Sequence, residues 1–298
     1  MTAATVVDRY PTRRAEAPEP FPRPDPVLYP SAGGPLAAEQ CERFGHDGFV
    51  VVDEIVDQGT VAALLAEVER MATDPAVTSS ERVVKEPGGD DVRSVFEVHR
   101  ISSLIASVVA SEAVAGMARQ LLGSDVYVHQ SRVNRKPGFV GKEFAWHSDF
   151  ETWHAEDGMP AARAVSVSIA LTPNYVHNGS LMIVPGSHRT FVPTAGETPG
   201  DHYRESLRRQ EIGVPSPQQL ADLVEATGGE IAVVTGPAGS AVAFDCNAMH
   251  GSSSNITPFP RTNLFVVFNS VENALVEPFA APARRPEFIA SRDFTPLV

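Results

Sequence analysis

The chain has 298 residues, of which 43% are hydrophobic and 20% are charged, as is usual for a folded globular protein. This composition excludes extensive disorder, collagen and coiled coil. The formal net charge of −13 repels phosphate backbones and anionic lipid, so we expect neither nucleic acid nor a membrane surface as a partner.

Cysteine is scarce, because Cys41 and Cys246 are the only two and lie far apart in the sequence. This spacing excludes a secreted disulfide scaffold. The N-terminus lacks an apolar core of signal-peptide length. The longest largely apolar stretch, residues 102–118, is too short and too polar to span a bilayer. We therefore expect a cytoplasmic protein.

The N-terminal segment, residues 1–35, contains eight prolines. Proline at this density favours extended conformations over a helix, so the segment is predicted to be an arm laid on the body or a loose tail. Residues 36–298 are predicted to form one domain. A polar insertion with some helix is expected around residues 196–227.

Helices are predicted in the first half of the chain, at residues 35–44, 58–73 and 101–122. A strand is expected from the sequence GFVVVDEIV between the first two. The second helix follows from the spacing of Val61, Leu64, Leu65 and Val68, and the third is expected to end at Gly123.

After residue 124 the pattern changes to short apolar runs separated by Gly, Pro and Asn. This alternation predicts a mainly β fold, either a sandwich or a barrel, with the earlier helices at its flank. The predicted strands are DVYVHQSRV, AVSVSIALT, SLMIVPG, EIAVVTG, SAVAFD and TNLFVVFNS. Neither GxGxxG nor GxxxxGK[ST] occurs, so no nucleotide-binding loop is predicted.

Two His-x-acid pairs attract attention, His147 with Asp149 and His154 with Glu156. On an extended segment residues i and i+2 point to the same side, so such a pair can converge on one metal ion. A third ligand from a distant strand end, for which His250 is suited, would complete a 2-His-1-carboxylate face for Fe(II). Spacing alone does not choose between the two pairs. Arg261, at the start of a later strand, is suited to a bidentate pair with a carboxylate.

Several longer blocks resemble the ectoine hydroxylases, in the phytanoyl-CoA dioxygenase-like branch of the Fe(II)/2-oxoglutarate oxygenases. The resemblance covers nearly the whole chain, and its most specific block is HSDFETWHAEDGMP. It favours His147 and Asp149 over His154 and Glu156 as the metal pair. The other blocks are HQSRVNRKPGF, LMIVPGSH, GETPGDHY and AMHGSSSN.

The resemblance implies a double-stranded β-helix, which is a cupin-like jelly-roll barrel, and a homodimer. It implies that ectoine, 2-oxoglutarate and O₂ become 5-hydroxyectoine, succinate and CO₂, in compatible-solute biosynthesis. Related halogenases have a small residue in place of Asp149, so the carboxylate here indicates hydroxylation. The implied roles are Fe(II) ligation by His147, Asp149 and His250; 2-oxoglutarate binding by Lys136, Arg261, Asn134 and Ser252; and ectoine binding by Gln130, Trp153, Phe244, Asn263 and Phe265.

Strand periodicity supports this set. Gln130 and Asn134 share one face of a strand and Lys136 keeps their parity, while Arg261, Asn263 and Phe265 share a face of a later strand. Arg261 is expected to be the bidentate clamp on 2-oxoglutarate, with Lys136 as a second contact.

Ectoine is a zwitterionic cyclic amidine. The amide of Gln130 can donate and accept hydrogen bonds, and the indole face of Trp153 suits a delocalised cation.

Two alternatives remain at this stage. The first is a related hydroxylase of proline or another small zwitterion, which would have the same metal and 2-oxoglutarate residues. The second is a jelly-roll protein that binds metal without catalysis.

Overall fold

The computed structural model describes residues 6–86, 89, 91–207 and 209–297. Its strands are short except for two near the middle of the larger sheet. They are β1 Phe21–Pro22, β2 Phe49–Val52, β3 Val83–Lys85, β4 Val92–Phe96, β5 Val126–Lys136, β6 Phe144–His147, β7 Ala164–Ala170, β8 Leu181–Ile183, β9 Thr190–Phe191, β10 Ala232–Val234, β11 Ala241–Asp245, β12 His250–Ser252 and β13 Arg261–Ser270.

The helices lie mainly before β5 and in the insertion. They are α1 Ala38–Asp47, α2 Gln58–Thr73, α3 Pro75–Thr78, α4 Val98–Ile101, α5 Ser103–Ala110, α6 Met117–Leu122, α7 Asp149–Thr152, α8 Tyr203–Ser206 and α9 Pro217–Ala226. Short π or 3₁₀ turns are η1 Glu112–Gly116, η2 Trp153–Asp157, η3 Ser187–Arg189 and η4 Val271–Asn273.

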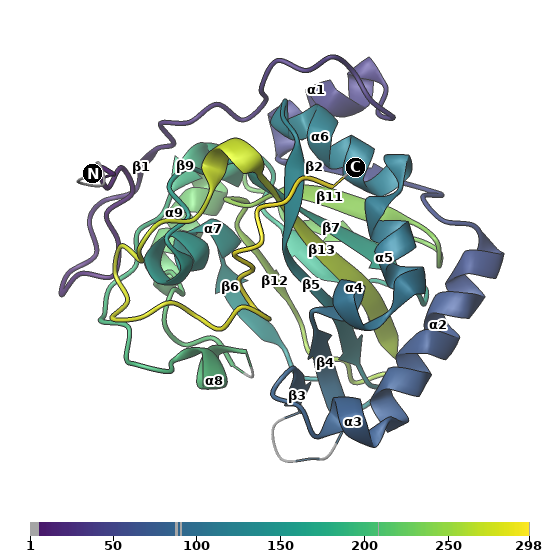
Figure 1. Ribbon diagram of the computed structural model, residues 1–298. Coiled ribbons are helices and arrows are strands. Elements are labelled where there is room, and N and C mark those ends of the chain that lie inside the picture. Colours follow the sequence, from purple (N-terminus) through teal and green to yellow (C-terminus); the bar gives the residue numbers. More distant parts are fainter. Residues whose placement is uncertain (1–5, 87–88, 90, 208, 298) are drawn as a thin grey trace.

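Two antiparallel sheets form the body of the molecule, as Figure 1 shows. The larger has the order β2-β11-β7-β13-β5-β4-β3 and the smaller β10-β8-β12-β6, while β1 and β9 form a separate pair. The two sheets share no strand in the described part of the chain, so they form an open sandwich and not one closed barrel. The prediction of a mainly β fold with flanking helices is confirmed.

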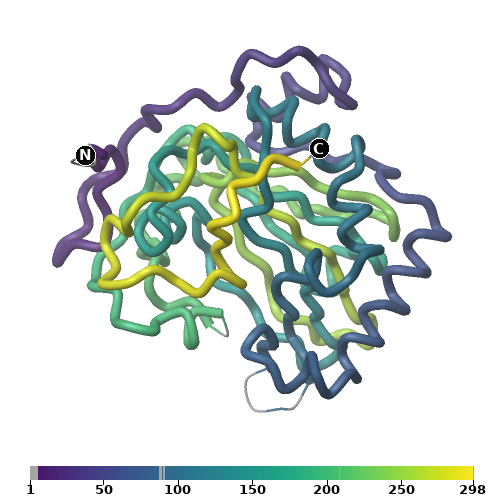
Figure 2. The backbone as a smooth tube through the Cα atoms, in the orientation of Figure 1, coloured from purple at the N-terminus to yellow at the C-terminus, as the bar shows by residue number. Residues whose placement is uncertain are grey.

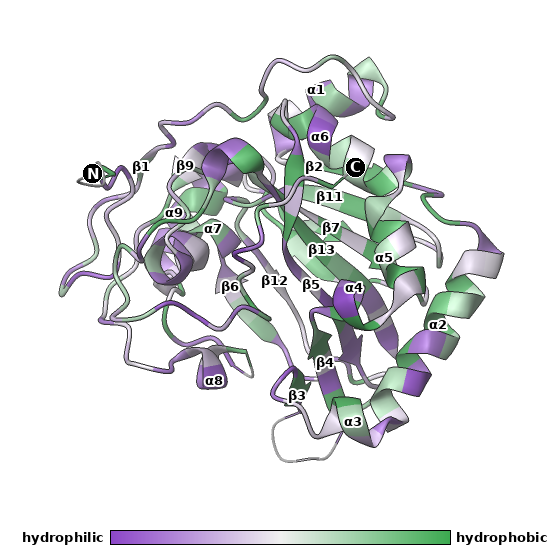
Figure 3. Ribbon diagram, viewed as in Figure 1, coloured by the Kyte–Doolittle hydropathy of each residue, from purple (hydrophilic) through white to green (hydrophobic). Residues whose placement is uncertain are grey.

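Helices cover one face of the larger sheet, and the smaller sheet covers the other. Helices α2, α5 and α6 pack on one face, where their apolar side chains meet residues such as Val133, Val167 and Val266. Figure 3 shows α2 carrying both hydrophobic and hydrophilic residues, as expected for a helix with one buried side. On the other face, Phe244 and Phe265 meet Leu181 of the smaller sheet. The sandwich therefore has a helix-covered side and an interior side.

A β-bulge in β5 decides which residues point into the interior. Val267 pairs with Gln130, but the next residue, Phe268, pairs with Val128, so His129 is an extra residue in β5. Val128 consequently joins the helix-covered core, whereas Gln130 turns to the interior. Bulges of this kind commonly redirect side chains beside functional sites.

All three predicted helices are found, one with the predicted bounds, one shifted and one divided. Helix α2 has the predicted bounds, and α1 begins three residues later than expected. The predicted helix at 101–122 is divided into α5, η1 and α6, and Ser102 caps α5 by accepting a hydrogen bond from the Ile105 amide. Its predicted end at Gly123 is confirmed, with φ of 58°.

The N-terminal segment follows the outside of the molecule toward α1, as Figure 2 shows. It is attached by the β1–β9 pair, by the fully buried Tyr10 and by a hydrogen bond from the Arg13 amide to the Thr194 carbonyl at 2.9 Å. The described part of the segment is therefore packed on the body. The division of the chain into this arm and one domain stays a prediction.

The described part of the chain contains no single helix with the length and hydropathy of a membrane span. One pair, Ser103–Ala110 with Glu112–Leu122, meets both criteria only when taken together and bends by 43°.

Candidate active site

A cavity opens on the interior side of the larger sheet, between β5 and β13 on one wall and β6, β12 and the α7–η2 segment on the other. The insertion also contributes to its lining. Residues that line it include Arg93, Phe96, Gln130, Arg132, Asn134, Lys136, Phe144, His147, Asp149, Thr152, Trp153, Glu156, Leu181, Ser206, Leu207, Gln210, Ile212, His250, Ser252, Arg261, Phe265 and Arg285.

Two histidines and one aspartate meet in this cavity. Strand β6 ends at His147 and α7 begins at Asp149, while antiparallel pairing of β6 with β12 places His250 opposite His147. The Asp149 carboxylate lies 3.5 Å from Nε2 of His147 and 3.9 Å from Nε2 of His250. One donor atom from each residue falls within 4.8 Å of the others, a spacing that could hold one metal ion.

Hydrogen bonds fix both imidazoles in the orientation that a metal requires. Nδ1 of His147 donates to the Ala145 carbonyl at 2.8 Å, and Nδ1 of His250 donates to the Ala248 carbonyl at 3.0 Å. Each ring therefore directs its Nε2 atom toward Asp149, where it can serve as a metal ligand.

The charge states also suit a metal centre. Burial, assisted by His147, lowers the pKa of His250 to about 4, so its ring is neutral at physiological pH. Burial alone would raise the pKa of Asp149, but His250, His147 and Arg132 together hold it below the ordinary value. Two imidazoles and one carboxylate match the donors of the 2-His-1-carboxylate iron sites.

The second His-x-acid pair does not form such a centre. Nδ1 of His154 lies 2.8 Å from the Met159 carbonyl and Nε2 lies 3.0 Å from Asp8, and the ring stacks on Phe279. Glu156 instead accepts a hydrogen bond from Arg13 at 2.9 Å. Both pairs are buried, and only the first directs its two side chains to one point.

Two basic side chains lie side by side farther along the cavity. The register of β13 on β5 pairs Arg261 with Lys136. Nε and Nη1 of Arg261 are buried without a hydrogen-bond partner, and burial beside Arg93 lowers the pKa of Arg261 to about 10. Burial, with Arg261 and Arg93 nearby, lowers the pKa of Lys136 to about 6. Because a buried guanidinium without a partner is costly, this end of the cavity is built for an anion.

Polar side chains complete that end of the cavity. Nζ of Lys136 donates to Oγ of Ser252 at 2.8 Å and to the Ser253 carbonyl at 2.6 Å. Asn134 lies two residues before Lys136 on the same face of β5 and contacts Ser94 at 3.5 Å. The structure thus brings all four residues predicted for 2-oxoglutarate into one part of the cavity.

The residues predicted for ectoine divide into two groups. Gln130, Trp153 and Phe265 line the cavity. Phe244 and Asn263 do not: the ring of Phe244 packs edge-on against His250 at 5.0 Å, and Nδ2 of Asn263 donates to Oγ of Ser168 at 2.9 Å. Phe244 therefore packs against the His250 ring, and Asn263 joins β13 to β7.

Sequence reasoning missed Arg132 and the contribution of the insertion. Arg132 lies between Gln130 and Asn134 at the same strand parity, a signal that was sufficient to find it. Its guanidinium donates to Gln130 and lies over the ring of Phe265 at 4.9 Å, and it forms no ion pair with a carboxylate among the described residues. No pattern in the sequence indicates that residues of the insertion line the cavity. These residues are Ser206, Leu207, Gln210 and Ile212.

Comparisons with known proteins agree with this geometry. The family model described as phytanoyl-CoA dioxygenase (PhyH) matches residues 44–263. An ectoine dioxygenase of Nocardia farcinica is 58% identical over 98% of this chain and 96% of its own length, and one of Streptomyces anulatus is 57% identical over the full length of both. The chain belongs to the ectoine dioxygenases, within the phytanoyl-CoA dioxygenase family.

Solved structures of an ectoine dioxygenase show the same fold. EctD from S. alaskensis in its apoform has a TM-score of 0.86 and 44% identity, covering 98% of this chain and 97% of that one. The same protein with 2-oxoglutarate and 5-hydroxyectoine has a TM-score of 0.85 and 43% identity, covering 98% and 100%. The predicted double-stranded β-helix is thereby confirmed, in the form of two facing sheets that do not close into one barrel.

Proposed function

We propose that this ectoine dioxygenase hydroxylates ectoine to 5-hydroxyectoine, with conversion of 2-oxoglutarate and O₂ to succinate and CO₂. The observation that carries the proposal is that one cavity contains two features. One is the three-donor metal site of His147, Asp149 and His250, and the other is the buried, unpaired guanidinium of Arg261. The names of relatives at 58% identity, and a solved structure with 2-oxoglutarate and 5-hydroxyectoine at 43% identity, support the choice of reaction. The same relatives disfavour proline as substrate and a non-catalytic metal-binding protein.

His147, Asp149 and His250 would hold Fe(II). When bound, the ion supplies the oxidising chemistry, because it coordinates 2-oxoglutarate and activates O₂. The role of this chain would be to present two imidazoles and one carboxylate to the ion.

The far carboxylate of 2-oxoglutarate would be clamped by Arg261. Its guanidinium is planar and suits a carboxylate, and the burial cost of its unpaired Nε and Nη1 groups would be relieved on binding. Lys136, Ser252 and Asn134 would orient the same end of the molecule.

Ectoine would lie between Arg132 and Trp153. The guanidinium of Arg132 suits the ectoine carboxylate, and the indole of Trp153, which is 3% exposed, offers a face to the amidinium. Gln130 would add an amide, and Phe265 would limit access of water. Phe244 and Asn263, which face other partners, are not included.

We also propose a homodimer in the cytoplasm. An exposed apolar face, formed by Phe139, Tyr175, Val176, Ile256 and Phe259, supports association, since large exposed apolar patches commonly mark interfaces. The two unpaired cysteines suit a reducing compartment, and the net charge of −13 disfavours nucleic acid and anionic membrane as partners.

The test is to compare metal content and turnover in variants of the His147–Asp149 pair with those of a control variant. Protein loaded with Fe(II) without oxygen is assayed with 2-oxoglutarate, O₂ and ectoine. His147→Ala and Asp149→Ala should lose bound iron and all 5-hydroxyectoine formation. A matched change outside the centre, Glu225→Ala on the exposed side of α9, should keep both. Full activity in His147→Ala would refute the assigned metal site.

A further inference from the structure

Arg13 of the N-terminal arm is the most unusual residue outside the site described so far. Its backbone has φ of 54°, in the left-handed region that a side chain with a Cβ seldom adopts. Its guanidinium is fully buried, as the 0% exposure of the side chain shows. A strained backbone and a buried charge persist only where the surroundings hold them firmly.

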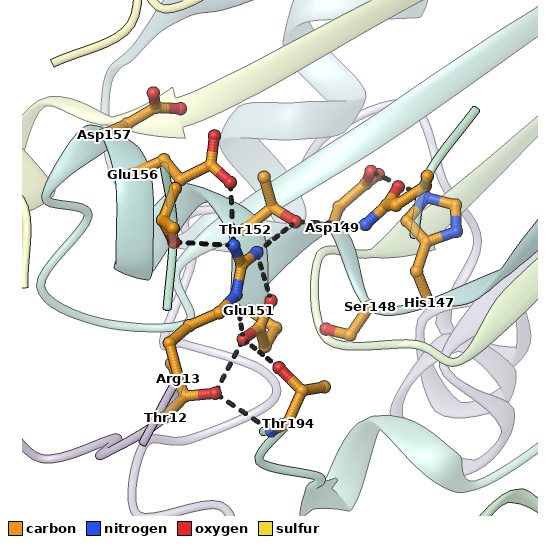
Figure 4. A network of polar contacts seen from close by, with 12 residues as sticks. Thr12, Arg13, His147, Ser148, Asp149, Glu151, Thr152, Glu156, Asp157 and Thr194 are labelled. Carbon is orange, nitrogen blue, oxygen red and sulfur yellow. Dashed lines mark hydrogen bonds and ion pairs between the residues drawn. The ribbon is translucent and has the colours of Figure 1, made fainter. Parts of the chain in front are cut away.

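Every N–H donor of the Arg13 guanidinium has an acceptor, as the contacts in Figure 4 show. Nε and Nη2 form a two-pronged pair with Glu151, both at 2.8 Å. Nη1 donates to Glu156 and to Thr198, both at 2.9 Å, and Nη2 also donates to Thr152 at 3.3 Å. Five donors in a fixed plane are a property of arginine that lysine lacks.

These acceptors belong to two segments that contribute to the lining of the cavity. Glu151, Thr152 and Glu156 lie on the α7–η2 segment, which also carries Asp149 and Trp153, and both Thr152 and Glu156 line the cavity. Thr198 belongs to the insertion. The arm is thus connected to the wall proposed for ectoine.

The insertion is packed on the same ion pair. A methyl group added at Gly213 would lie 2.6 Å from Nη2 of Arg13 and 2.7 Å from Oε2 of Glu151. Gln210, which lines the cavity, donates to Thr152 at 3.3 Å. One guanidinium therefore fixes the α7–η2 wall and the insertion relative to each other.

The opposite end of the cavity is independent of this network. The residues proposed for 2-oxoglutarate come from β5, β12 and β13, and none of the described polar contacts of Arg13 reaches these strands. Disturbing the guanidinium should therefore affect the two substrates unequally.

We propose that Arg13 is a positioning residue that holds Thr152, Trp153 and Glu156 on one side and the insertion on the other in the arrangement that binds ectoine. This inference rests on the proposed function for the identity of the substrate. It predicts that the N-terminal arm is part of the substrate site, although it does not line the cavity itself.

The experiment compares Arg13→Met with Arg14→Met in the full-length, iron-loaded enzyme. Arg14 is the neighbouring residue with an exposed side chain, so it is a matched control for loss of one arginine from the arm. Because Arg13→Met removes a buried charge, Gly213→Ala is the second variant, which keeps all the charges and disturbs the same pair. Arg13→Lys tests whether charge without the planar fork is sufficient.

Three quantities are measured for each variant. They are kcat/KM for ectoine, the ratio of 5-hydroxyectoine to succinate, and the Kd of 2-oxoglutarate from the visible absorption of the oxygen-free iron complex. Hydrogen exchange of the insertion in iron-free protein gives a readout that does not depend on turnover.

Arg13→Met, Arg13→Lys and Gly213→Ala should lower kcat/KM for ectoine by about tenfold or more, as expected when binding groups are displaced by a fraction of an ångström. They should also form succinate without equal 5-hydroxyectoine and exchange faster in the insertion. The Kd of 2-oxoglutarate should change by less than about twofold, since its site is separate. Arg14→Met should match the parent.

The inference is overturned if Arg13→Met and Gly213→Ala keep the parental kcat/KM for ectoine. It is also overturned if the Kd of 2-oxoglutarate weakens as much as ectoine turnover, because the role of Arg13 would then be general stability. Failure of the parent enzyme to hydroxylate ectoine would instead refute the proposed function, and the hydrogen-exchange comparison would still test Arg13.

Discussion

Arg261 is buried as an unpaired cation. This unpaired charge lowers the stability of the ligand-free protein, but it strengthens the binding of an anion. Without an anion its guanidinium lacks partners for Nε and Nη1, and burial lowers its pKa to about 10. Replacing it with leucine should weaken 2-oxoglutarate binding by about 2–5 kcal/mol, the usual cost of losing one member of a buried charge pair.

The same substitution should leave the thermal stability of the ligand-free protein unchanged or higher, since an unpaired buried charge is removed. Titration with 2-oxoglutarate and thermal melting of Arg261→Leu check both parts. The control is Arg135→Leu, which changes an arginine of the same strand β5 and breaks its partly exposed pair with Glu69 of α2. Parental affinity in Arg261→Leu would contradict the assignment of the clamp.

Lys136 should make 2-oxoglutarate binding depend on pH. Burial, Arg261 and Arg93 lower its pKa to about 6, against smaller opposing effects of Glu86 and Glu143, so the free protein holds it mostly neutral at pH 7. A bound dianion favours the ammonium form and raises this pKa, so binding takes up a proton. The affinity should therefore fall as pH rises from about 6 toward 8.

Calorimetry of 2-oxoglutarate binding in buffers of different ionisation enthalpy measures this proton uptake directly. Lys136→Met should abolish the uptake and flatten the pH dependence. An unchanged proton uptake in Lys136→Met would assign the titration to another group.

Individual site residues could be predicted where strand parity and a recognisable motif coincide. Lys136, Arg261, Gln130 and Phe265 meet that condition and line the cavity. Asn263 has the right parity but bonds to Ser168 on the adjacent strand, because parity gives the face of a sheet and not the partner of a side chain.

At the scale of secondary-structure elements, the α7–η2 segment depends on buried ion pairs and not on intrinsic helix propensity. It consists of single turns, and Glu151 on it accepts hydrogen bonds from Arg13, from Thr12 at 2.6 Å and from Thr194 at 2.8 Å. Isolated turns are not stable alone, so the surrounding chain must hold them.

Glu151→Ala should consequently lower the free energy of unfolding by about 3–5 kcal/mol, because it leaves the Arg13 guanidinium buried without its main partner. Glu225→Ala, at an exposed position of α9, should change it by less than about 0.5 kcal/mol. Chemical denaturation followed by fluorescence compares the two. Equal stabilities would show that the ion pair contributes nothing to the fold.

Elements with a clear period were predictable and elements without one were not. Helix α2 and strands β5, β7, β11 and β13 follow from apolar spacing. Strand β12 has the sequence HGS and β6 the sequence FAWH, and neither pattern indicates a strand. These two short strands become ordered by pairing with each other and, for β12, with β8, which is a tertiary effect.

At the scale of the whole molecule, one solvent-exposed face carries several large apolar side chains. Ile256 is 79% exposed, Phe139 67% and Phe259 51%, and the ring of Phe259 lies 5.9 Å from that of Tyr175. If this face joins two copies, the double variant Ile256→Asp with Phe259→Asp should be monomeric, because charges would be buried at the interface.

Light scattering after size-exclusion chromatography measures the mass of the parent and of this variant. Val7→Asp, in an equally exposed part of the arm, should leave the parent mass unchanged. A monomeric parent would contradict the proposed homodimer, and a dimeric double variant would place the interface on another face.

The central claim is that this cavity couples oxidation of 2-oxoglutarate to hydroxylation of ectoine. The most direct measurement is to follow succinate and 5-hydroxyectoine by chromatography in one aerobic reaction of the iron-loaded enzyme. The account predicts that both accumulate in equal amounts and that neither forms without iron. Succinate without 5-hydroxyectoine would contradict the assigned substrate, and the absence of both products from folded, iron-loaded protein would contradict the assigned chemistry.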